Sequence, residues 1–179
     1  MKKELRFFLL FLFFFVSLIL QTTIIPFFQV GGVIPNLLLV LIIFTALYYG
    51  SGVGGAVGFT VGLIQDLLVG RYFGLLALSG LVTGYLTGYL EGKVYKENPL
   101  VPLLLVFSGS LCASLVFITA RSLIGSFSFS LPLVWRDLIP GAFYNTLLAV
   151  FLFRPFTWLV NPRPSPGVDP VHMYLDYRG

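Results

Sequence analysis

Charged residues are scarce in this chain. Only 10% of its 179 residues are Asp, Glu, Lys or Arg, whereas a soluble domain carries about 25%. Hydrophobic residues make up 58%, and the mean hydropathy is +0.96. This composition excludes a separate soluble domain and predicts an integral membrane protein. The eleven Lys and Arg lie almost wholly at the ends of apolar runs, which gives no support for nucleic-acid binding.

Cysteine and histidine are almost missing. Cys112 is the single cysteine, which rules out an intramolecular disulfide, and His172 is the single histidine. A zinc site is therefore excluded on ligand count. The chain also lacks a Ser paired with a His base, carboxylates paired on one apolar segment and an Asp-rich motif for magnesium. We expect no catalytic residues, no metal site, no cofactor and no enzyme activity.

A signal-peptide cleavage site is lacking as well. The first apolar run, residues 7–20, follows Lys2, Lys3 and Arg6, as the apolar core of a secretory signal does. The expected pair of small residues is absent after the run, where Gln21 and two threonines stand instead. We therefore expect this segment to be retained as the first helix.

Long apolar runs, in contrast, are abundant. Six of them are separated by breaks rich in Gly, Pro or charge, and most approach the roughly 20 residues that cross a bilayer: residues 5–23, 35–49, 53–69, 74–90, 100–120 and 138–160. The sequence predicts an all-α integral membrane fold, a six-helix transmembrane bundle in residues 1–160, with an extended cytoplasmic tail in residues 161–179. Because the second run is short, runs 35–49 and 53–69 alternatively form a re-entrant pair that dips in from the outer face.

Positive charge orients the bundle. With the N-terminus in the cytoplasm, eight basic residues lie inside and three outside, as the positive-inside rule requires: Lys2, Lys3, Arg6, Lys93, Lys96, Arg154, Arg163 and Arg178 inside, and Arg71, Arg121 and Arg136 outside. The expected location is the bacterial inner membrane, with both termini cytoplasmic.

This orientation predicts the result of a topology assay. Reporters fused after Glu97 and after Gly179 should both read cytoplasmic, because both points lie on the side that carries the excess of Lys and Arg. A reporter activity characteristic of the outer side at either point would contradict the topology.

Two glycine ladders with four-residue spacing run through the middle of the chain. An interior Gly costs a helix about 1 kcal/mol relative to Ala, but in lipid small residues let helices approach closely. We therefore expect these positions to form helix-packing or partner interfaces: Gly50, Gly54, Gly58 and Gly62 followed in phase by Asp66, and then Gly80, Gly84, Gly88 and Gly92.

Two polar residues lie deep in apolar runs. Asp66 has three possible roles: it accepts hydrogen bonds from amides around Gly74 at the start of the next helix, it pairs with Arg71, or it forms a proton or cation site. The first two would make it a structural lock, which we favour because no second titratable residue lies at that depth. Asn145 is expected to pin the last helix to another helix, because an amide facing lipid would be costly. Asn36, after Pro35, is typical of a helix start.

The longest outer loop is expected between residues 122 and 137. Ser126-Phe127-Ser128-Phe129-Ser130 alternates polar and apolar residues like a short strand. The segment either lies on the membrane surface or adds a strand to the sheet of a partner.

The order of several motifs resembles that of the MreD family of bacterial rod shape-determining membrane proteins. The resemblance covers most of residues 30–150 and rests on the following segments: Pro35-Asn36-Leu37-Leu38, Gly58-Phe59-x-x-Gly62-Leu63-x-x-Asp66-Leu67-Leu68-x-Gly70, Gly74-Leu75-x-Ala77-Leu78, Gly84-Tyr85-Leu86-x-Gly88 and Pro140-x-Ala142-x-x-Asn145-x-Leu147-Leu148. The family commonly has Pro-Asp-Leu where this chain has Pro35-Asn36-Leu37.

The resemblance implies an adaptor of the cell-elongation machinery. Such a protein binds the bitopic protein MreC and links MreB filaments inside the cell to RodA and class B penicillin-binding protein, which synthesise peptidoglycan. The family also resembles in fold the substrate-binding subunits of energy-coupling-factor transporters, so a small-molecule-binding transport subunit is the alternative. Co-purification with MreC would favour the adaptor, and co-purification with an ATPase pair would favour the transporter.

Overall fold

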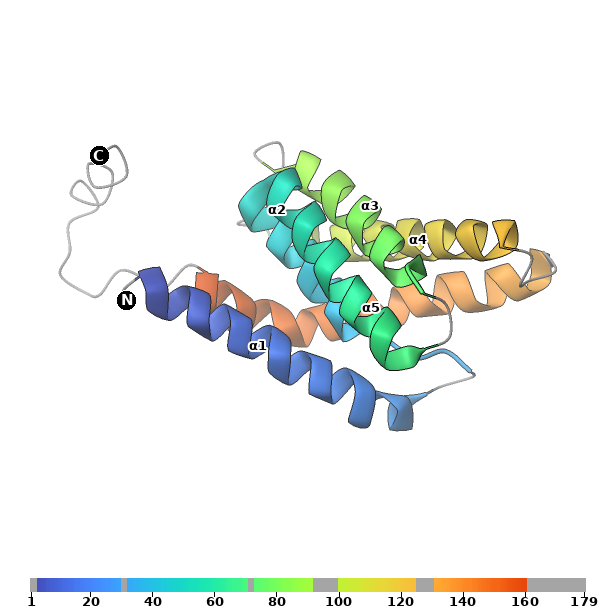
Figure 1. Ribbon diagram of the computed structural model, residues 1–179, viewed down its shortest axis with the longest axis horizontal. Helices are drawn as coiled ribbons and strands as arrows, with labels where there is room; N and C mark the ends of the chain where they lie inside the picture. Colours follow the sequence, from blue (N-terminus) through green and yellow to red (C-terminus); the bar gives the residue numbers. More distant parts are fainter. Residues whose placement is uncertain (1–2, 30–31, 71–72, 92–99, 125–130, 161–179) are drawn as a thin grey trace.

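The computed structural model describes residues 3–29, 32–70, 73–91, 100–124 and 131–160. Within these ranges the regular elements are all helices, which confirms the all-α prediction. In chain order they are α1 (Lys3–Thr23), the short 3-10 helix η1 (Ile25–Phe28), α2 (Leu37–Val69), α3 (Leu75–Tyr89), α4 (Leu100–Leu123) and α5 (Leu131–Val160), as Figure 1 shows. The start of α1 and the end of α5 lie toward the same end of the longest axis.

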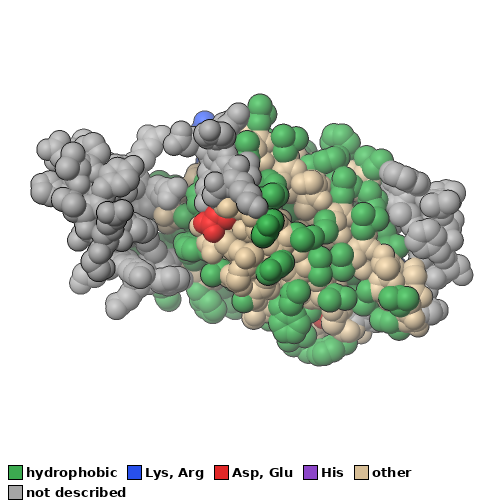
Figure 2. Space-filling view, turned by 90° about the horizontal axis from the view of Figure 1, so that it is seen from above, with side chains coloured by type: hydrophobic (Ala, Val, Ile, Leu, Met, Phe, Trp, Pro, Cys, Tyr) green, Lys and Arg blue, Asp and Glu red, His purple; other side chains and the backbone are tan. Residues whose placement is uncertain are grey.

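The surface of the bundle is apolar. Figure 2 shows hydrophobic side chains spread over the described part of the face in view. Phe11, Leu104 and Phe151 are each at least 67% exposed, which a soluble monomer would avoid over so wide an area. Among the residues that the structure describes, three segments are long and apolar enough to cross a membrane, namely Leu37–Val69, Leu100–Leu123 and Leu138–Val160. Two shorter apolar helices accompany them there.

Helix α2 reverses its direction at Gly50. This residue has φ 84° and ψ 179°, a conformation that L residues with a Cβ atom rarely adopt. The two arms, residues 37–49 and 51–69, fold against each other: a Cβ atom built on Gly54 would lie 2.5 Å from Cβ of Ala46, and one built on Gly58 would lie 3.2 Å from Cγ2 of Ile42.

The described residues therefore contain five α-helices, not six separate ones. The expected break at residues 50–52 shrinks to a single residue, since Gly50 alone turns the chain and both arms stay helical up to it. Runs 35–49 and 53–69 become the two arms of one element.

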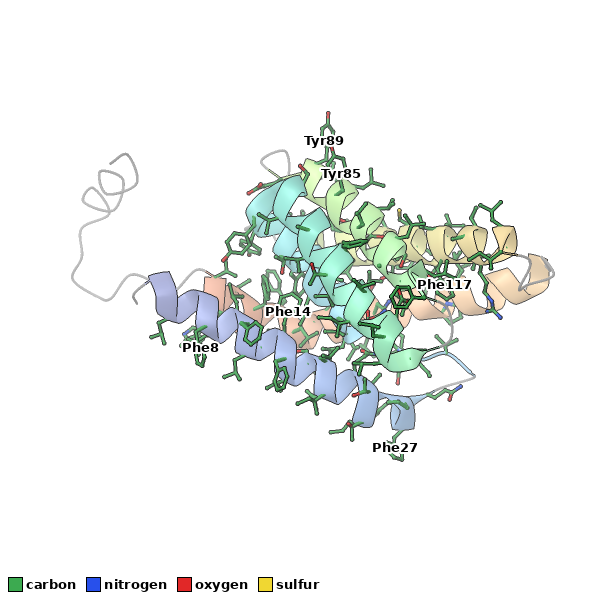
Figure 3. All side chains as sticks on the ribbon, in the orientation of Figure 1. Phe8, Phe14, Phe27, Tyr85, Tyr89 and Phe117 are labelled. Atoms are coloured by element: carbon green, nitrogen blue, oxygen red, sulfur yellow. The ribbon has the colours of Figure 1, made fainter. Side chains whose placement is uncertain are left out.

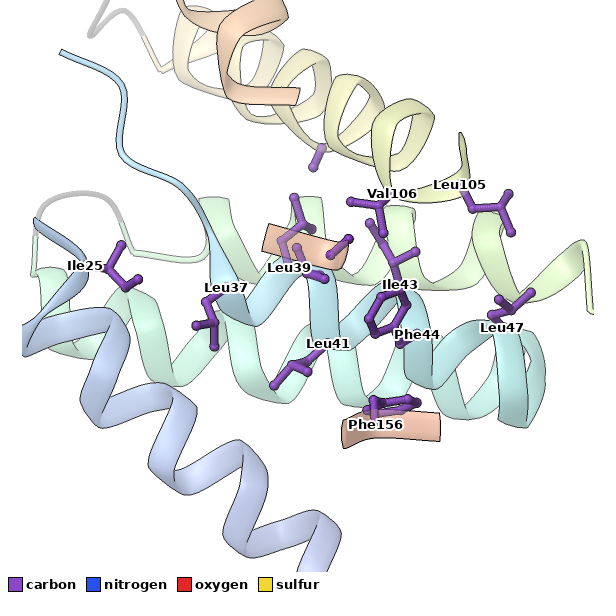
Figure 4. Close-up of a cluster of buried hydrophobic side chains, with 13 residues drawn as sticks. Ile25, Leu37, Leu39, Leu41, Ile43, Phe44, Leu47, Leu105, Val106 and Phe156 are labelled. Carbon is purple, nitrogen blue, oxygen red and sulfur yellow. The ribbon is translucent and has the colours of Figure 1, made fainter. Parts of the chain in front are cut away.

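The first arm of α2 forms the centre of the protein. Every residue from Leu37 to Leu47 is at most 7% exposed, so this arm is apolar on all sides, as a helix enclosed by others must be. Phe44 packs against Phe153 and Phe156 of α5, with ring centroids 5.8 and 5.4 Å apart. Figure 4 shows Phe156 on one side of the arm and Leu105 and Val106 of α4 on the other.

Helix α1 lies at the edge of the bundle. Figure 3 shows Phe8 pointing away from the bundle and Phe14 pointing toward it, while Phe27 of η1 also points outward. Phe8 and Phe27 are 60% and 86% exposed, whereas Phe14 packs against the core cluster. One face of the phenylalanine-rich run therefore contributes to the core, and the other is open to the surroundings.

The expected outer loop is shorter than predicted. Ser122 and Leu123 belong to α4, and α5 begins at Leu131, so residues 131–137 are helical. The prediction stopped both helices where the apolar run ended, but a helix can continue past the apolar layer. Residues 126–130, with the strand-like pattern, and the tail, residues 161–179, lie outside the described residues.

Candidate functional site

The predicted interface glycines meet in a single seam between the second arm of α2 and α3. A Cβ atom built on Gly58 would lie 2.6 Å from the carbonyl carbon of Gly80, and one built on Gly84 would lie 2.6 Å from that of Gly54. Gly62 faces the backbone of Leu76 and Ala77, while Gly88 faces Gly50 and Ser51. The neighbour of these glycines is thus a helix of the same chain. Gly92 lies outside the described residues.

Asp66 lies at the end of this seam where α3 begins, and it holds the start of α3. Its carboxylate accepts three backbone hydrogen bonds: Oδ2 from the N–H groups of Gly74 and Ala77, each at 3.0 Å, and Oδ1 from that of Leu76 at 3.1 Å. Asp66 is 2% exposed. A carboxylate at a helix N-terminus satisfies amides that have no partner within the helix and interacts favourably with the helix dipole. These bonds are the ones expected of the first alternative, in which Asp66 accepts from amides at the start of the next helix.

Among the described residues, no group of three or more His, Cys, Asp or Glu side chains could hold a metal ion. Arg71, the other expected partner, lies outside the described residues.

Asn145 joins three elements. Its Oδ1 accepts a hydrogen bond from the N–H group of Asn36 at 2.7 Å, and its Nδ2 donates to Oγ of Ser110 in α4 at 3.1 Å. Asn145 is 6% exposed, and its bond to Ser110 is buried, while the bond to Asn36 is partly buried. Asn36 caps α2, because its Oδ1 accepts from the N–H group of Leu39 at 3.0 Å, which confirms the helix start predicted there.

Gln21 performs a similar task, which was not predicted from the sequence. Its Oε1 accepts from the N–H group of Leu37 at 2.7 Å, and its Nε2 donates to the carbonyl of Pro35 at 3.1 Å. The C-terminal end of α1 is thereby tied to the start of α2. A general rule could have indicated this role, because the first N–H groups of a helix need hydrogen-bond acceptors from outside the helix. Gln21 and Gln29 are the two glutamines that precede α2 in the chain.

A cavity of about 480 Å³ opens at the same end of the bundle. Four helices and the segment before α2 contribute to its wall. Its polar residues are Asn36, Ser79, Ser114, Arg121 and Asn145, and Val33, Phe117 and Leu138 are among the apolar ones. We call it the outer cavity, because the orientation predicted from the sequence would put it on the outer side of the membrane.

Two apolar grooves lie on the sides of the bundle. One, of about 640 Å³, separates α1 from both arms of α2 and is lined by residues such as Phe11, Phe15, Ala56 and Thr60. The other, of about 730 Å³, runs along α5. We call them the α1/α2 groove and the α5 groove.

The contacts of Asn145 predict a measurable loss of stability. Asn145→Leu is expected to cost about 2–4 kcal/mol, because the N–H group of Asn36 and the Ser110 hydroxyl lose their partner. Ser110→Ala removes only one of the two bonds and should cost about 1 kcal/mol. Thermal unfolding of the purified protein in detergent measures both changes. A larger loss for Ser110→Ala than for Asn145→Leu would contradict the joint role of Asn145.

The curated proteins gave no match to this chain, and neither did the solved structures. A family model matches residues 1–162, and its description is rod shape-determining protein MreD.

Proposed function

The chain belongs to the MreD family of rod shape-determining membrane proteins, and from this membership we propose that it is a non-catalytic adaptor of the bacterial cell-elongation machinery. The adaptor binds an MreC-type bitopic protein and connects MreB filaments in the cytoplasm with RodA and a class B penicillin-binding protein. It resides in the inner membrane, which α1, the two arms of α2, α3, α4 and α5 cross, with both termini in the cytoplasm.

The use of the buried polar groups supports a binding role. Asp66, Asn145 and Gln21 direct their hydrogen bonds to backbone or side-chain groups of other elements, so these groups stabilise the arrangement of helices. A scaffold fixed in this way presents its surfaces in a constant geometry, which lowers the entropic cost of binding a partner.

The outer cavity is the observation that carries the proposal. Its wall combines the polar side chains of Asn36, Ser114 and Asn145 with apolar ones. A bitopic protein places the residues that follow its transmembrane helix at this level of the membrane. Hydrogen bonds from a short peptide segment would satisfy the polar groups, and the apolar wall would accept its side chains. We assign the outer cavity to the membrane-proximal segment of MreC.

The inner side of the protein has a different expected partner. The segment with Lys93 and Lys96 and the tail, residues 161–179, lie outside the described residues, and their Lys and Arg face the cytoplasm in the proposed orientation. These charges attract anionic lipid and would lie beside the cytoskeletal components.

Filling the outer cavity tests the proposal. Ser114→Phe places a ring in the cavity, whereas Ser108→Phe places the same ring on the exposed side of the same helix. We expect Ser114→Phe to abolish co-purification of MreC from native membranes and to produce rounded cells, while the protein accumulates normally. Ser108→Phe should leave both readouts unchanged.

Mass spectrometry of the wild-type protein purified from native membranes decides between the two functions. Recovery of MreC and other elongation proteins supports the adaptor. Recovery of a bound vitamin or an ATPase pair, with no elongation protein, would overturn the adaptor in favour of a transport subunit.

A further inference from the structure

The outer cavity and the α5 groove share a wall. Val33 lines both of them, and Gly141 of the cavity follows Pro140 of the groove directly in α5. A Cβ atom built on Gly141 would lie 3.6 Å from Cγ1 of Val33, so the two hollows meet where the segment before α2 crosses α5. The N–H group of Asn36, at the end of this segment, donates a hydrogen bond to Oδ1 of Asn145 in α5 at 2.7 Å, which holds the segment against α5.

The α5 groove has the form of a helix-sized surface. Phe143, Leu147 and Val150 recur every three or four residues and therefore lie on one face of α5. They are 63%, 57% and 51% exposed. From Pro140 to Val150 the groove extends about 15 Å along the helix axis, at 1.5 Å per residue. Its outer end is Val33, at the mouth of the outer cavity.

We infer that the α5 groove receives the single transmembrane helix of the bitopic partner, an inference that rests on the proposed function. In a bitopic protein the transmembrane helix and the membrane-proximal segment are consecutive in the chain. A partner whose membrane-proximal segment occupies the outer cavity must therefore leave the membrane within a few residues of it. The α5 groove ends at that point.

The α1/α2 groove lacks this continuity. It shares no lining residue with the outer cavity. The first arm of α2 separates the two hollows, since Leu38 lines the groove and its neighbour Leu39 lines the cavity, while both side chains are almost completely buried. A partner helix in the α1/α2 groove would reach the outer cavity only by passing around this arm. We therefore expect lipid chains to occupy the α1/α2 groove.

Cysteine crosslinking distinguishes the two grooves. In a Cys112→Ala background, Phe143→Cys, Leu147→Cys and Val150→Cys are each combined with single cysteines along the MreC transmembrane helix. Ala56→Cys, Thr60→Cys and Ile64→Cys serve as matched positions in the α1/α2 groove. We expect several-fold more crosslinked product at the three α5 positions, on one face of the MreC helix.

The outcomes separate this inference from the proposed function. If MreC co-purifies but crosslinks at the α1/α2 groove or at neither groove, the α5 docking site is wrong and the adaptor role stands. If MreC does not co-purify with the uncrosslinked protein, the proposed function itself fails.

Discussion

Gly58→Ala is expected to prevent the bundle from assembling, although it adds a single methyl group. The new Cβ atom would collide with the carbonyl group of Gly80, whose carbon would lie 2.6 Å away. Backbone atoms cannot rotate out of the way as a side chain can, so α2 and α3 would have to separate along the whole seam. We expect a loss of at least about 3 kcal/mol, the upper end of the usual cost of overpacking.

Other glycines of the same arm provide matched controls. A Cβ atom on Gly55 would meet Cβ of Tyr85 at 3.6 Å, an ordinary contact, and one on Gly52 would have no neighbour within 4 Å. Gly55→Ala should therefore be tolerated, and Gly52→Ala should stabilise the helix by up to about 1 kcal/mol. Val61→Leu, outside the seam, should also be tolerated. Size-exclusion chromatography and thermal unfolding in detergent measure all four variants. Equal stability of Gly58→Ala and Gly55→Ala would contradict the close packing of α2 against α3 at Gly58.

Asp66→Leu is expected to be the second severe change. It leaves the N–H groups of Gly74, Leu76 and Ala77 without their acceptor, and each buried unsatisfied group costs about 1–3 kcal/mol. Because two of the three bonds are only partly buried, the expected total is in the lower part of the summed range, about 3–5 kcal/mol. It should be seen as poor accumulation in the membrane and loss of MreC co-purification. Asp66→Asn should be milder, at about 1–2 kcal/mol, because its one oxygen can still accept from Gly74 and Ala77 while its NH₂ group faces the N–H group of Leu76.

Gln65 provides the control for Asp66. It is buried beside Asp66 at 8% exposure, and its side chain forms no hydrogen bond among the described residues, so Gln65→Leu should accumulate normally. Equal loss of MreC binding in Asp66→Leu and Asp66→Asn, with normal accumulation of both, would assign the effect to the negative charge and contradict the hydrogen-bonding role.

Local sequence patterns predicted the contacts that depend on local chemistry. The four-residue spacing of Gly54, Gly58 and Gly62 placed them on one helix face. Small residues on such a face let helices pack closely in a bilayer, which predicted a helix–helix contact there. Asp66 lies close in the chain to the start of α3, so a short turn is enough to bring its carboxylate to the N–H groups of Gly74, Leu76 and Ala77. The N-cap at Asn36 could be predicted because Asn is a preferred residue at helix starts.

Contacts that depend on the whole arrangement could not be predicted in this way. The sequence gives no direct sign that Gly50 alone reverses α2, since three glycine and serine residues at 50–52 suggest a longer break. The partners of Asn145, Asn36 and Ser110, lie 109 and 35 residues away in the chain. The outer cavity arises only when four helices are placed together, and no local pattern marks its wall.

The buried first arm of α2 affects the order in which a cell can build this protein. Many of the side chains that bury this arm belong to helices that are synthesised later. Phe156, which packs in the same core cluster, is among the last described residues to be translated. We expect both arms to leave the insertion machinery together as a hairpin and to wait in the lipid for α4 and α5. A ribosome that stalls before α5 would leave an unfinished core in the membrane, open to proteases.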